Sequence, residues 1–237
     1  TTSGTGDGVP RLKSLQTPPG VCVGLVAQGF TFARGIAQLP SGDFVMAEMG
    51  GWAKDRGAVW ILRRLPNGQF SKTRIAKLID KPSGVAVGPD GLAYIGAPDG
   101  IFRFDPYEQN ADPIPKTGKF RASPEYKQPK FKVVVNDLPG EGRHPLARFV
   151  FDKQNPWVLY ANVGSASDVC EQGTTPPPAG NPFPCAEADG QKARGAIRKY
   201  DLSASPDHVS TGYTVLAKGL RNSMALAVHP TSNALIQ

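Results

Sequence analysis

Short runs of alternating apolar and polar residues recur four times along the chain, each interrupted by a turn rich in proline, glycine, asparagine or aspartate. A first alternating run, a turn and a second run form the pattern of a β-hairpin with one buried face. The hairpins are expected at residues 35–48, 84–98, 148–164 and 225–237, with starts 49, 64 and 77 residues apart. Such repeats predict a β-propeller, in which each blade covers its apolar faces by packing on its neighbours.

Further alternating runs complete the first three blades. Their strands are expected at residues 21–27, 58–64, 70–78, 100–104, 132–135, 196–200 and 213–217. Residues 105–130 are rich in proline and charge and are expected to form a surface loop. Residues 1–20 are expected to be a linker or mature N-terminus, and residues 21–237 one domain. Because three and a half blades cannot close a propeller, we expect this domain to be the N-terminal part of a larger one.

The composition agrees with a turn-rich all-β protein. The chain has 237 residues, 40% of them hydrophobic, with 27 glycines and 23 prolines, which does not fit disorder. No apolar run approaches the ~20 residues of a membrane span, so no membrane partner is expected. The net charge of +7 is spread along the chain, without the basic face and interleaved aromatic residues typical of nucleic-acid binding. A solvated cationic surface explains it, and the alternative is attraction of an anionic cofactor or acidic protein.

The cysteine positions favour an oxidising compartment. Cys170 and Cys185 enclose a proline-rich loop, and a disulfide across a loop of this length contributes ~3 kcal/mol. Neither cysteine has the spacing of a metal site. We therefore expect a disulfide and a secreted, extracellular protein. Cys22 is left over, and is either buried or paired outside this chain.

Aligning the four hairpins places chemically useful residues at equivalent positions. Four residues before each hairpin, the loops that lead into successive inner strands carry Thr31, Asp80, His144 and Arg221. These loops open on one mouth of the propeller channel. Three more residues are expected in the same neighbourhood: Arg34, Arg148 and Asn222. In contrast, Asn162, Ser165 and Asp168 follow the second strand of the third hairpin and are expected at the opposite rim or in the loop beyond it.

Histidine and arginine at a channel mouth suit proton transfer beside an anion. Neutral imidazole accepts a proton near pH 7, and guanidinium groups pair with carboxylates. His144 is therefore the candidate base and the arginines are candidate anion ligands. The alternatives are that His144 is an ordinary surface residue of a turn, and that Arg148 bridges two blades through backbone carbonyls.

Several short motifs, taken in order, resemble one family. HPLARFVFD, LYANVGSASDVCE, GAIRKYD and GLRNSMALAVHP are similar to segments of the quinoprotein glucose/sorbosone dehydrogenase family. Within it, residues 163–171 resemble a segment of the fungal pyranose dehydrogenase type. The resemblance runs from about residue 21 onward and is strongest between residues 143 and 230.

This resemblance implies a six-bladed propeller that binds pyrroloquinoline quinone (PQQ) with Ca²⁺. It also implies oxidation of a pyranose hydroxyl, often at the anomeric carbon, by hydride transfer to the quinone. By position, His144 matches the general base, and Arg221 and Asn222 match the residues that contact the quinone oxygens. Arg34 and Arg148 are expected to contact the cofactor, whose three carboxylates favour arginine ligands.

The same resemblance implies partners that the residues themselves do not identify. The substrate would be a small sugar, and the electron acceptor a cytochrome domain or another redox protein. The calcium ligands are expected beyond Gln237, so no metal ligand is named. Two other functions stay open: a non-catalytic propeller that binds a protein or glycan, and a calcium-dependent lactone hydrolase, for which Glu48 is the obvious inward-facing carboxylate.

Overall fold

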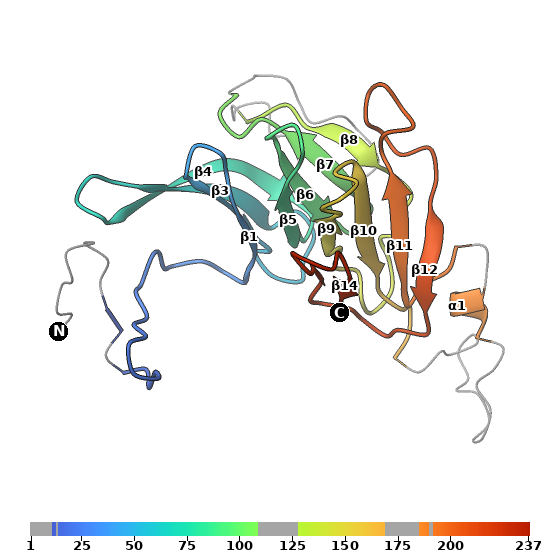
Figure 1. Ribbon diagram of the computed structural model, residues 1–237, viewed down its shortest axis with the longest axis horizontal. Helices are drawn as coiled ribbons and strands as arrows, with labels where there is room; N and C mark the ends of the chain where they lie inside the picture. The colour runs from blue at the N-terminus through green and yellow to red at the C-terminus, as the bar shows by residue number, and fades with distance from the viewer. Residues whose placement is uncertain (1–10, 13, 109–127, 169–184, 190–191) are drawn as a thin grey trace.

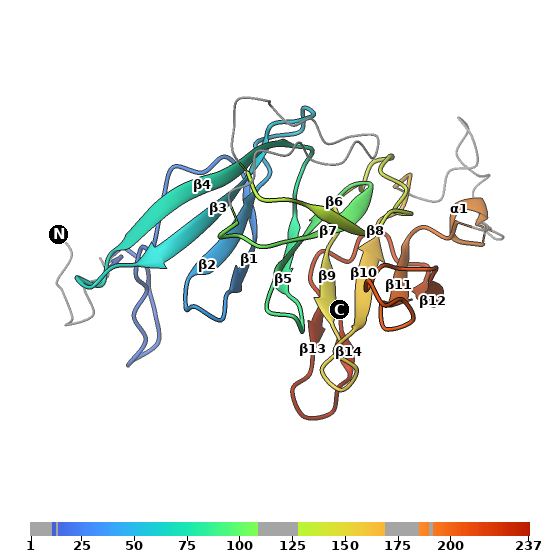
Figure 2. The ribbon, with the colours of Figure 1, turned by 90° about the horizontal axis from the view of Figure 1, so that it is seen from above.

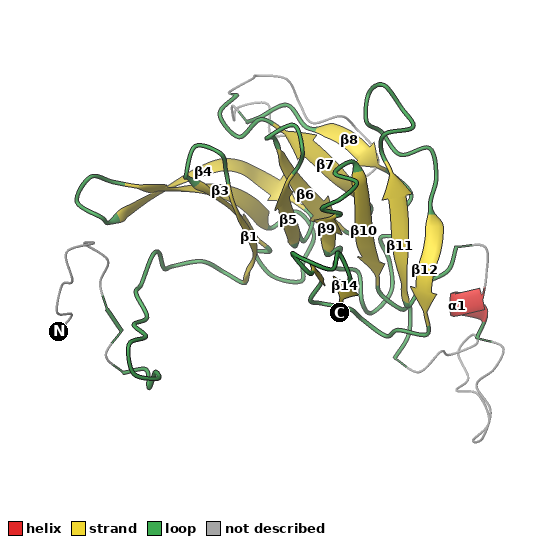
Figure 3. Ribbon diagram, in the orientation of Figure 1, coloured by secondary structure: helices red, strands yellow, loops and turns green. Residues whose placement is uncertain are grey.

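The computed structural model describes residues 11–12, 14–108, 128–168, 185–189 and 192–237. Within them the protein is all-β, with three four-stranded antiparallel sheets and one two-stranded sheet (Figure 3). The strands of each sheet pair in chain order from the inner strand outward. The described residues contain one short helix, α1, at Ala186–Asp189, and no helix among them is long and apolar enough to span a membrane.

Each sheet is one blade, named here by its place in the chain. Blade 1 comprises β1 (Ala33–Gln38), β2 (Phe44–Glu48), β3 (Gly57–Arg64) and β4 (Phe70–Ile79). Blade 2 comprises β5 (Gly84–Val87), β6 (Ala93–Ala97), β7 (Gly100–Phe104) and β8 (Lys132–Val135). Blade 3 comprises β9 (Phe149–Phe151), β10 (Val158–Val163), β11 (Ala196–Asp201) and β12 (Thr214–Lys218), followed by the pair β13 (Ala227–Val228) and β14 (Leu235–Ile236).

The blades lie side by side in chain order, as Figures 1 and 2 show. Successive side chains of a strand point to opposite faces of its sheet, so a blade between two neighbours is apolar on both faces. Blade 2 has this position, and all five residues of β6 are buried. Val59 and Ile61 of blade 1 belong to a core with Ile95 of blade 2. Tyr94, on the other face of β6, belongs to a second core with Leu159 of blade 3.

Glycines let the inner strands approach one another closely. A Cβ atom at Gly35 of β1 would lie 2.5 Å from the carbonyl oxygen of Ser83, and one at Gly84 of β5 would lie 2.5 Å from that of Ala147. A side chain at either position would force the adjacent blades apart. The glycines at the start of the first two hairpins are therefore packing residues.

The structure confirms the propeller-type all-β architecture and the four hairpins. The strand expected at residues 21–27 is wrong: this segment makes only an isolated bridge between Gly24 and Arg11, and Val21 and Val26 are exposed. Alternation alone cannot make a strand that has no partner strand along its length. The six-blade count stays a prediction, and most of the expected loop at 105–130 lies outside the described residues.

The cysteines are described in part. Cys22 is free and exposed, and the side chains of Val21 and Val23 beside it are exposed as well, so the expectation that it might be buried is wrong: among the described residues, no element packs over this segment. Cys170 lies outside the described residues, and the disulfide between it and Cys185 stays a prediction.

Candidate functional site

The first candidate site lies where the loop leading into β9 meets the loop leaving β10. These strands are antiparallel, so the start of one and the end of the other lie at the same rim of blade 3. The expectation that Asn162, Ser165 and Asp168 face the opposite rim or a loop beyond is therefore wrong. The hairpin instead brings all three to the rim that carries His144 and Arg221.

His144 is held on both sides of its ring. Its Nδ1 atom lies 3.0 Å from the hydroxyl oxygen of Ser165 and 3.1 Å from the carbonyl oxygen of the same residue. Its Nε2 atom lies 3.4 Å from Oδ1 of Asp168. Only 10% of the His144 side chain is exposed, so it is not the solvated surface histidine of the alternative interpretation.

Asp168 gathers three basic side chains. The guanidinium groups of Arg143 and Arg221 each donate to one of its carboxylate oxygens, and His144 faces the oxygen that Arg221 contacts. The hydrogen bonds from Arg221 and then Arg143 hold the pKa of the Asp168 carboxyl below its ordinary value. The carboxylate is therefore ionised at neutral pH and faces the imidazole as a negative charge.

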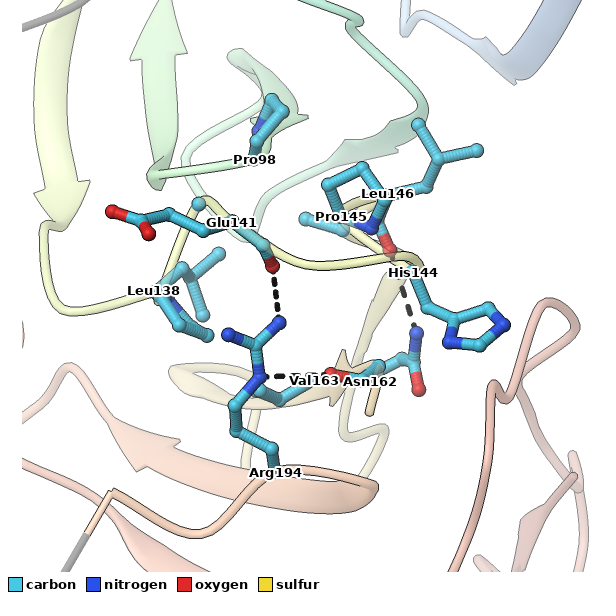
Figure 4. Close-up of a pocket in the computed structure, with 13 residues that line it drawn as sticks. Pro98, Leu138, Glu141, His144, Pro145, Leu146, Asn162, Val163 and Arg194 are labelled. Atoms are coloured by element: carbon cyan, nitrogen blue, oxygen red, sulfur yellow. Dashed lines mark hydrogen bonds between the residues drawn. The ribbon is translucent and has the colours of Figure 1, made fainter. Parts of the chain in front are cut away.

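Asn162 connects this rim to the segment before β13. Its side-chain oxygen accepts from the backbone N–H of Ser223 at 3.0 Å. Its amide group donates to the side-chain oxygen of Asn222 at 3.3 Å and to the carbonyl of Leu146 at 3.4 Å, the latter drawn in Figure 4. Asn222 is thereby placed beside blade 3, close to the loop that carries His144.

Arg194 closes the space behind the histidine. Its guanidinium donates to the carbonyls of Gly164 and Glu141, and burial lowers its pKa. Figure 4 shows the His144 ring turned away from Arg194. The cavity between them measures about 10 Å³, enough for about one water molecule, so a ligand must approach the histidine from its other side.

The second candidate site is a groove along the inner strands. It has a volume of about 430 Å³ and is lined by Arg34, Arg148 and mainly apolar residues, among them Ile36, Met224 and Leu226. Arg148 donates from one guanidinium nitrogen to the carbonyl of Ser83 at 2.9 Å, which is the interblade contact of the alternative interpretation. No acidic side chain among the described residues lines the groove.

The two groove arginines carry positive charge that no acidic side chain among the described groove residues neutralises. The Nε atoms of both Arg34 and Arg148 are buried without a hydrogen-bond partner. Burial, and then the positive charge of Arg34, lower the pKa of Arg148. Two buried donors and two cations that repel each other fit an anionic ligand, and the carboxylates of PQQ meet this requirement.

Thr31 and Asp80, the positions equivalent to His144 and Arg221 in blades 1 and 2, make hydrogen bonds or ion pairs within their own blades. Asp80 is buried, and its Oδ1 atom lies 2.6 Å from Nζ of the adjacent Lys81. Thr31 donates its backbone N–H to Glu48, which also accepts from the indole of Trp60. Both carboxylate oxygens of Glu48 are thus used within blade 1. The described residues contain no group of three or more His, Cys, Asp or Glu side chains that could hold a metal ion.

Three residues of the first site were not predicted from the sequence: Arg143, Glu187 and Arg194. Asp168 was named but expected at the wrong rim. Asp168 could have been placed correctly, because in an antiparallel hairpin the entry to the first strand and the exit from the second share a rim. Glu187 and Arg194 come from the connection between β10 and β11, and no local pattern marks them.

Comparison with known proteins supports the fold. The chain matches no protein-family model and no curated protein sequence. It is similar in structure to the PQQ domain of pyranose dehydrogenase from Coprinopsis cinerea, with 20% identity, a TM-score of 0.57, and coverage of 85% of this chain and 42% of the other. It is also similar to a Trichoderma reesei enzyme of carbohydrate-active family AA12, with 16% identity, a TM-score of 0.61, and coverage of 90% and 46%.

These likenesses define the class of fold. The chain has the fold of part of the PQQ domain of this pyranose dehydrogenase and of part of the AA12 enzyme, in agreement with the resemblance of its sequence motifs. It spans less than half the length of either structure.

Proposed function

We propose that this chain is part of an oxidoreductase of the quinoprotein sugar dehydrogenase kind. More specifically, it would use PQQ and Ca²⁺ to oxidise a hydroxyl of a pyranose, often at the anomeric carbon. The fold supports the class. The observation that carries the proposal is the pair of half-buried arginines, Arg34 and Arg148, which line an open groove and whose buried Nε atoms have no hydrogen-bond partner among the described residues.

Arginine residues would hold the cofactor. Arg34 and Arg148 would pair with its carboxylates, and Arg221 and Asn222 would contact its quinone oxygens. Asp168 already holds Arg221 at this rim, and Asn162 holds Asn222 there. Both side chains are therefore in place before the cofactor binds. When bound, PQQ supplies the acceptor for the hydride of the sugar.

His144 would accept the proton of the sugar hydroxyl. The ring is largely buried and held by Ser165, which keeps its orientation during the proton transfer. The ionised Asp168, 3.4 Å from Nε2, stabilises the imidazolium that results. His144 thus combines a fixed geometry with a counter-charge, and both favour its action as a general base.

The remaining parts of the proposal concern the surroundings of the reaction. The Trichoderma reesei protein was determined as a calcium structure, which supports Ca²⁺ as the second cofactor. We propose a small sugar as substrate, a cytochrome domain or other redox protein as electron acceptor, and secretion as the location.

Calorimetric titration of the metal-stripped full-length protein with PQQ, with and without Ca²⁺, tests the proposal. We expect near-stoichiometric binding that requires Ca²⁺, followed by reduction of the quinone when pyranoses are added. An Arg63→Gln variant is the control, because Arg63 pairs with Asp43 on blade 1, away from the groove. Absence of PQQ binding under both conditions would overturn the quinoprotein assignment and favour a propeller that binds a protein or glycan.

A further inference from the structure

One short segment, residues 165–168, contacts both ring nitrogens of His144. The hydroxyl and carbonyl oxygens of Ser165 lie 3.0 and 3.1 Å from Nδ1. The Oδ1 atom of Asp168 lies 3.4 Å from Nε2. Because the two nitrogens of a neutral imidazole are one donor and one acceptor, the partners on each side decide which nitrogen carries the proton.

The direction of the Ser165 hydroxyl follows from its other partner. Its oxygen lies 2.6 Å from the carbonyl oxygen of Ser167, to which it donates. A carbonyl cannot donate, so the single proton of the hydroxyl is used in this bond. The hydroxyl therefore presents a lone pair to His144.

Nδ1 of His144 consequently meets two acceptors. The Ser165 hydroxyl accepts because its proton is used elsewhere, and the Ser165 carbonyl can only accept. Nδ1 must carry the proton to satisfy them. Nε2 also faces an acceptor, the Asp168 carboxylate, but at 3.4 Å, which is longer than either contact of Nδ1. The single proton of the neutral ring therefore belongs on Nδ1, and Nε2 keeps its lone pair.

Glu187 of α1 holds the segment in this arrangement. Its Oε1 atom accepts from the hydroxyl of Ser167 at 2.6 Å. Its Oε2 atom accepts from the backbone N–H groups of Ala166 and Ser167. The carbonyl of Ser167, which orients the Ser165 hydroxyl, is thus fixed by a carboxylate from a separate element.

We infer that Ser165 and Glu187 are positioning residues that fix His144 in its Nδ1-protonated tautomer, with Nε2 as the proton-accepting atom. The role in turnover rests on the proposed function, whereas the tautomer itself does not. Asp168 acts at a different stage, because its carboxylate faces Nε2 and stabilises the ring after Nε2 has taken a proton.

Nuclear magnetic resonance of the protein labelled with ¹⁵N in its histidine rings tests the tautomer directly. The chain has three histidines, and the signals lost in His144→Gln identify those of His144. We expect a protonated Nδ1 and an unprotonated Nε2 in the neutral ring. A neutral ring protonated on Nε2 would overturn the inference.

Variants test the two positioning residues. Ser165→Ala should raise the Nε2-protonated fraction about tenfold, the size of effect expected for the loss of one hydrogen bond. Glu187→Gln should act in the same direction with a smaller effect, and Ser165→Thr, which keeps the hydroxyl, should restore the original tautomer. Ser203→Ala is the matched control, because Ser203 bonds only within its own turn, to Asp201. An unchanged tautomer in folded Ser165→Ala would overturn the role of Ser165.

Turnover separates this inference from the proposed function. In Ser165→Ala we expect kcat to fall in proportion to the loss of the Nδ1-protonated tautomer, with an unchanged KM for the sugar. If the wild-type protein binds no PQQ, the proposed function fails while the tautomer result stands. If PQQ binds but His144 carries its proton on Nε2, the proposed function stands and the inference fails.

Discussion

Blades 2 and 3 share a strand pattern but use the same position in opposite ways. At the start of the inner strand of blade 2, Gly84 is paired with Gly96. At the equivalent position of blade 3, Asn162 donates its backbone N–H to the carbonyl of Arg148 at 2.7 Å. Blade 2 therefore has no side chains at the pair of positions where blade 3 has two polar ones, those of Arg148 and Asn162.

The glycine pair makes room and the polar pair makes contacts. Cβ atoms at Gly84 and Gly96 would lie 2.5 and 2.6 Å from the carbonyl oxygen of Ala147, so the glycines admit the loop that enters blade 3. Arg148 reaches back to Ser83, and Asn162 binds the segment before β13. A repeated hairpin thus determines the backbone, whereas the neighbouring blade determines what each position does.

The loops before these strands differ in the same way. Asp80 of blade 2 pairs with its sequence neighbour Lys81. His144, at the equivalent place in blade 3, contacts Ser165 and Asp168 across the hairpin. A local pair stabilises its own loop, whereas contacts across the hairpin build a site.

The largest effect, a loss of turnover, is expected at His144 and not at Asp80, its equivalent in blade 2. His144→Ala should lower kcat by a factor of about 10² to 10⁴, the usual contribution of a general base, with PQQ affinity within a few-fold of wild type. Asp80→Asn should leave turnover per folded molecule unchanged. Steady-state kinetics and a PQQ titration measure both. Equal losses in the two variants would contradict the distinction between the loops.

Substitution in the pair Arg34 and Arg148 should lower PQQ affinity and hardly change the stability of the fold. Arg34→Gln should weaken PQQ binding about tenfold or more, because a charged hydrogen bond to a carboxylate is lost. The thermal midpoint of the ligand-free protein should not fall, since removing one of two repelling cations relieves Arg148. Calorimetry and thermal unfolding measure the two effects. A lowered midpoint with unchanged affinity would assign Arg34 to stability alone.

Substitution in the pair Gly84 and Gly96 should lower the stability of the fold. Gly84→Ala should lower the free energy of unfolding by about 1–3 kcal/mol, as is usual for overpacking. Gly96→Ala should act similarly, and the two losses should not add, because both substituents meet the same carbonyl of Ala147. Urea unfolding of the two single variants and of the double variant measures this. A Gly84→Ala protein as stable as wild type would show that the loop entering blade 3 can move away.

The smallest effect is expected from the pH dependence of Asp168. Its pKa is lowered by Arg221 and Arg143, so the ionised carboxylate stabilises the fold above the ordinary pKa of aspartate. This contribution is lost as the pH falls through the lowered pKa. Asp168→Asn should therefore make stability less dependent on pH below about 4, and added salt should reduce the difference because the pairs are exposed. Identical acid unfolding curves would contradict this linkage.

Most of the scaffold could be predicted from the chain. Strands β3, β4, β7 and β11 lie within one or two residues of their expected bounds, because apolar alternation and turn residues act locally. The strand predicted from the same alternation at residues 21–27 is wrong, since a strand also needs a hydrogen-bonded neighbour. His144 and Arg221 were correctly expected at one rim, because equivalent loops of repeated hairpins open on the same side.

Which residues make up the site was harder to predict from the sequence. Asp168 is 24 residues beyond His144 in the sequence and was expected elsewhere. Glu187 reaches Ser167 from a helix after a long connection. Such contacts depend on how a loop returns over a blade, which no local pattern encodes.

The sequence by itself determined the hairpin repeat, the all-β class and the residue types available at one rim, because strand formation follows from local alternation and turn chemistry. Only the tertiary structure decided that Asp168 and Ser165 contact opposite sides of His144, and that Arg34 and Arg148 face one groove. The physical reason is that charge pairs and hydrogen bonds need partners within about 3–4 Å, and distances of that size between separate blades are set by packing.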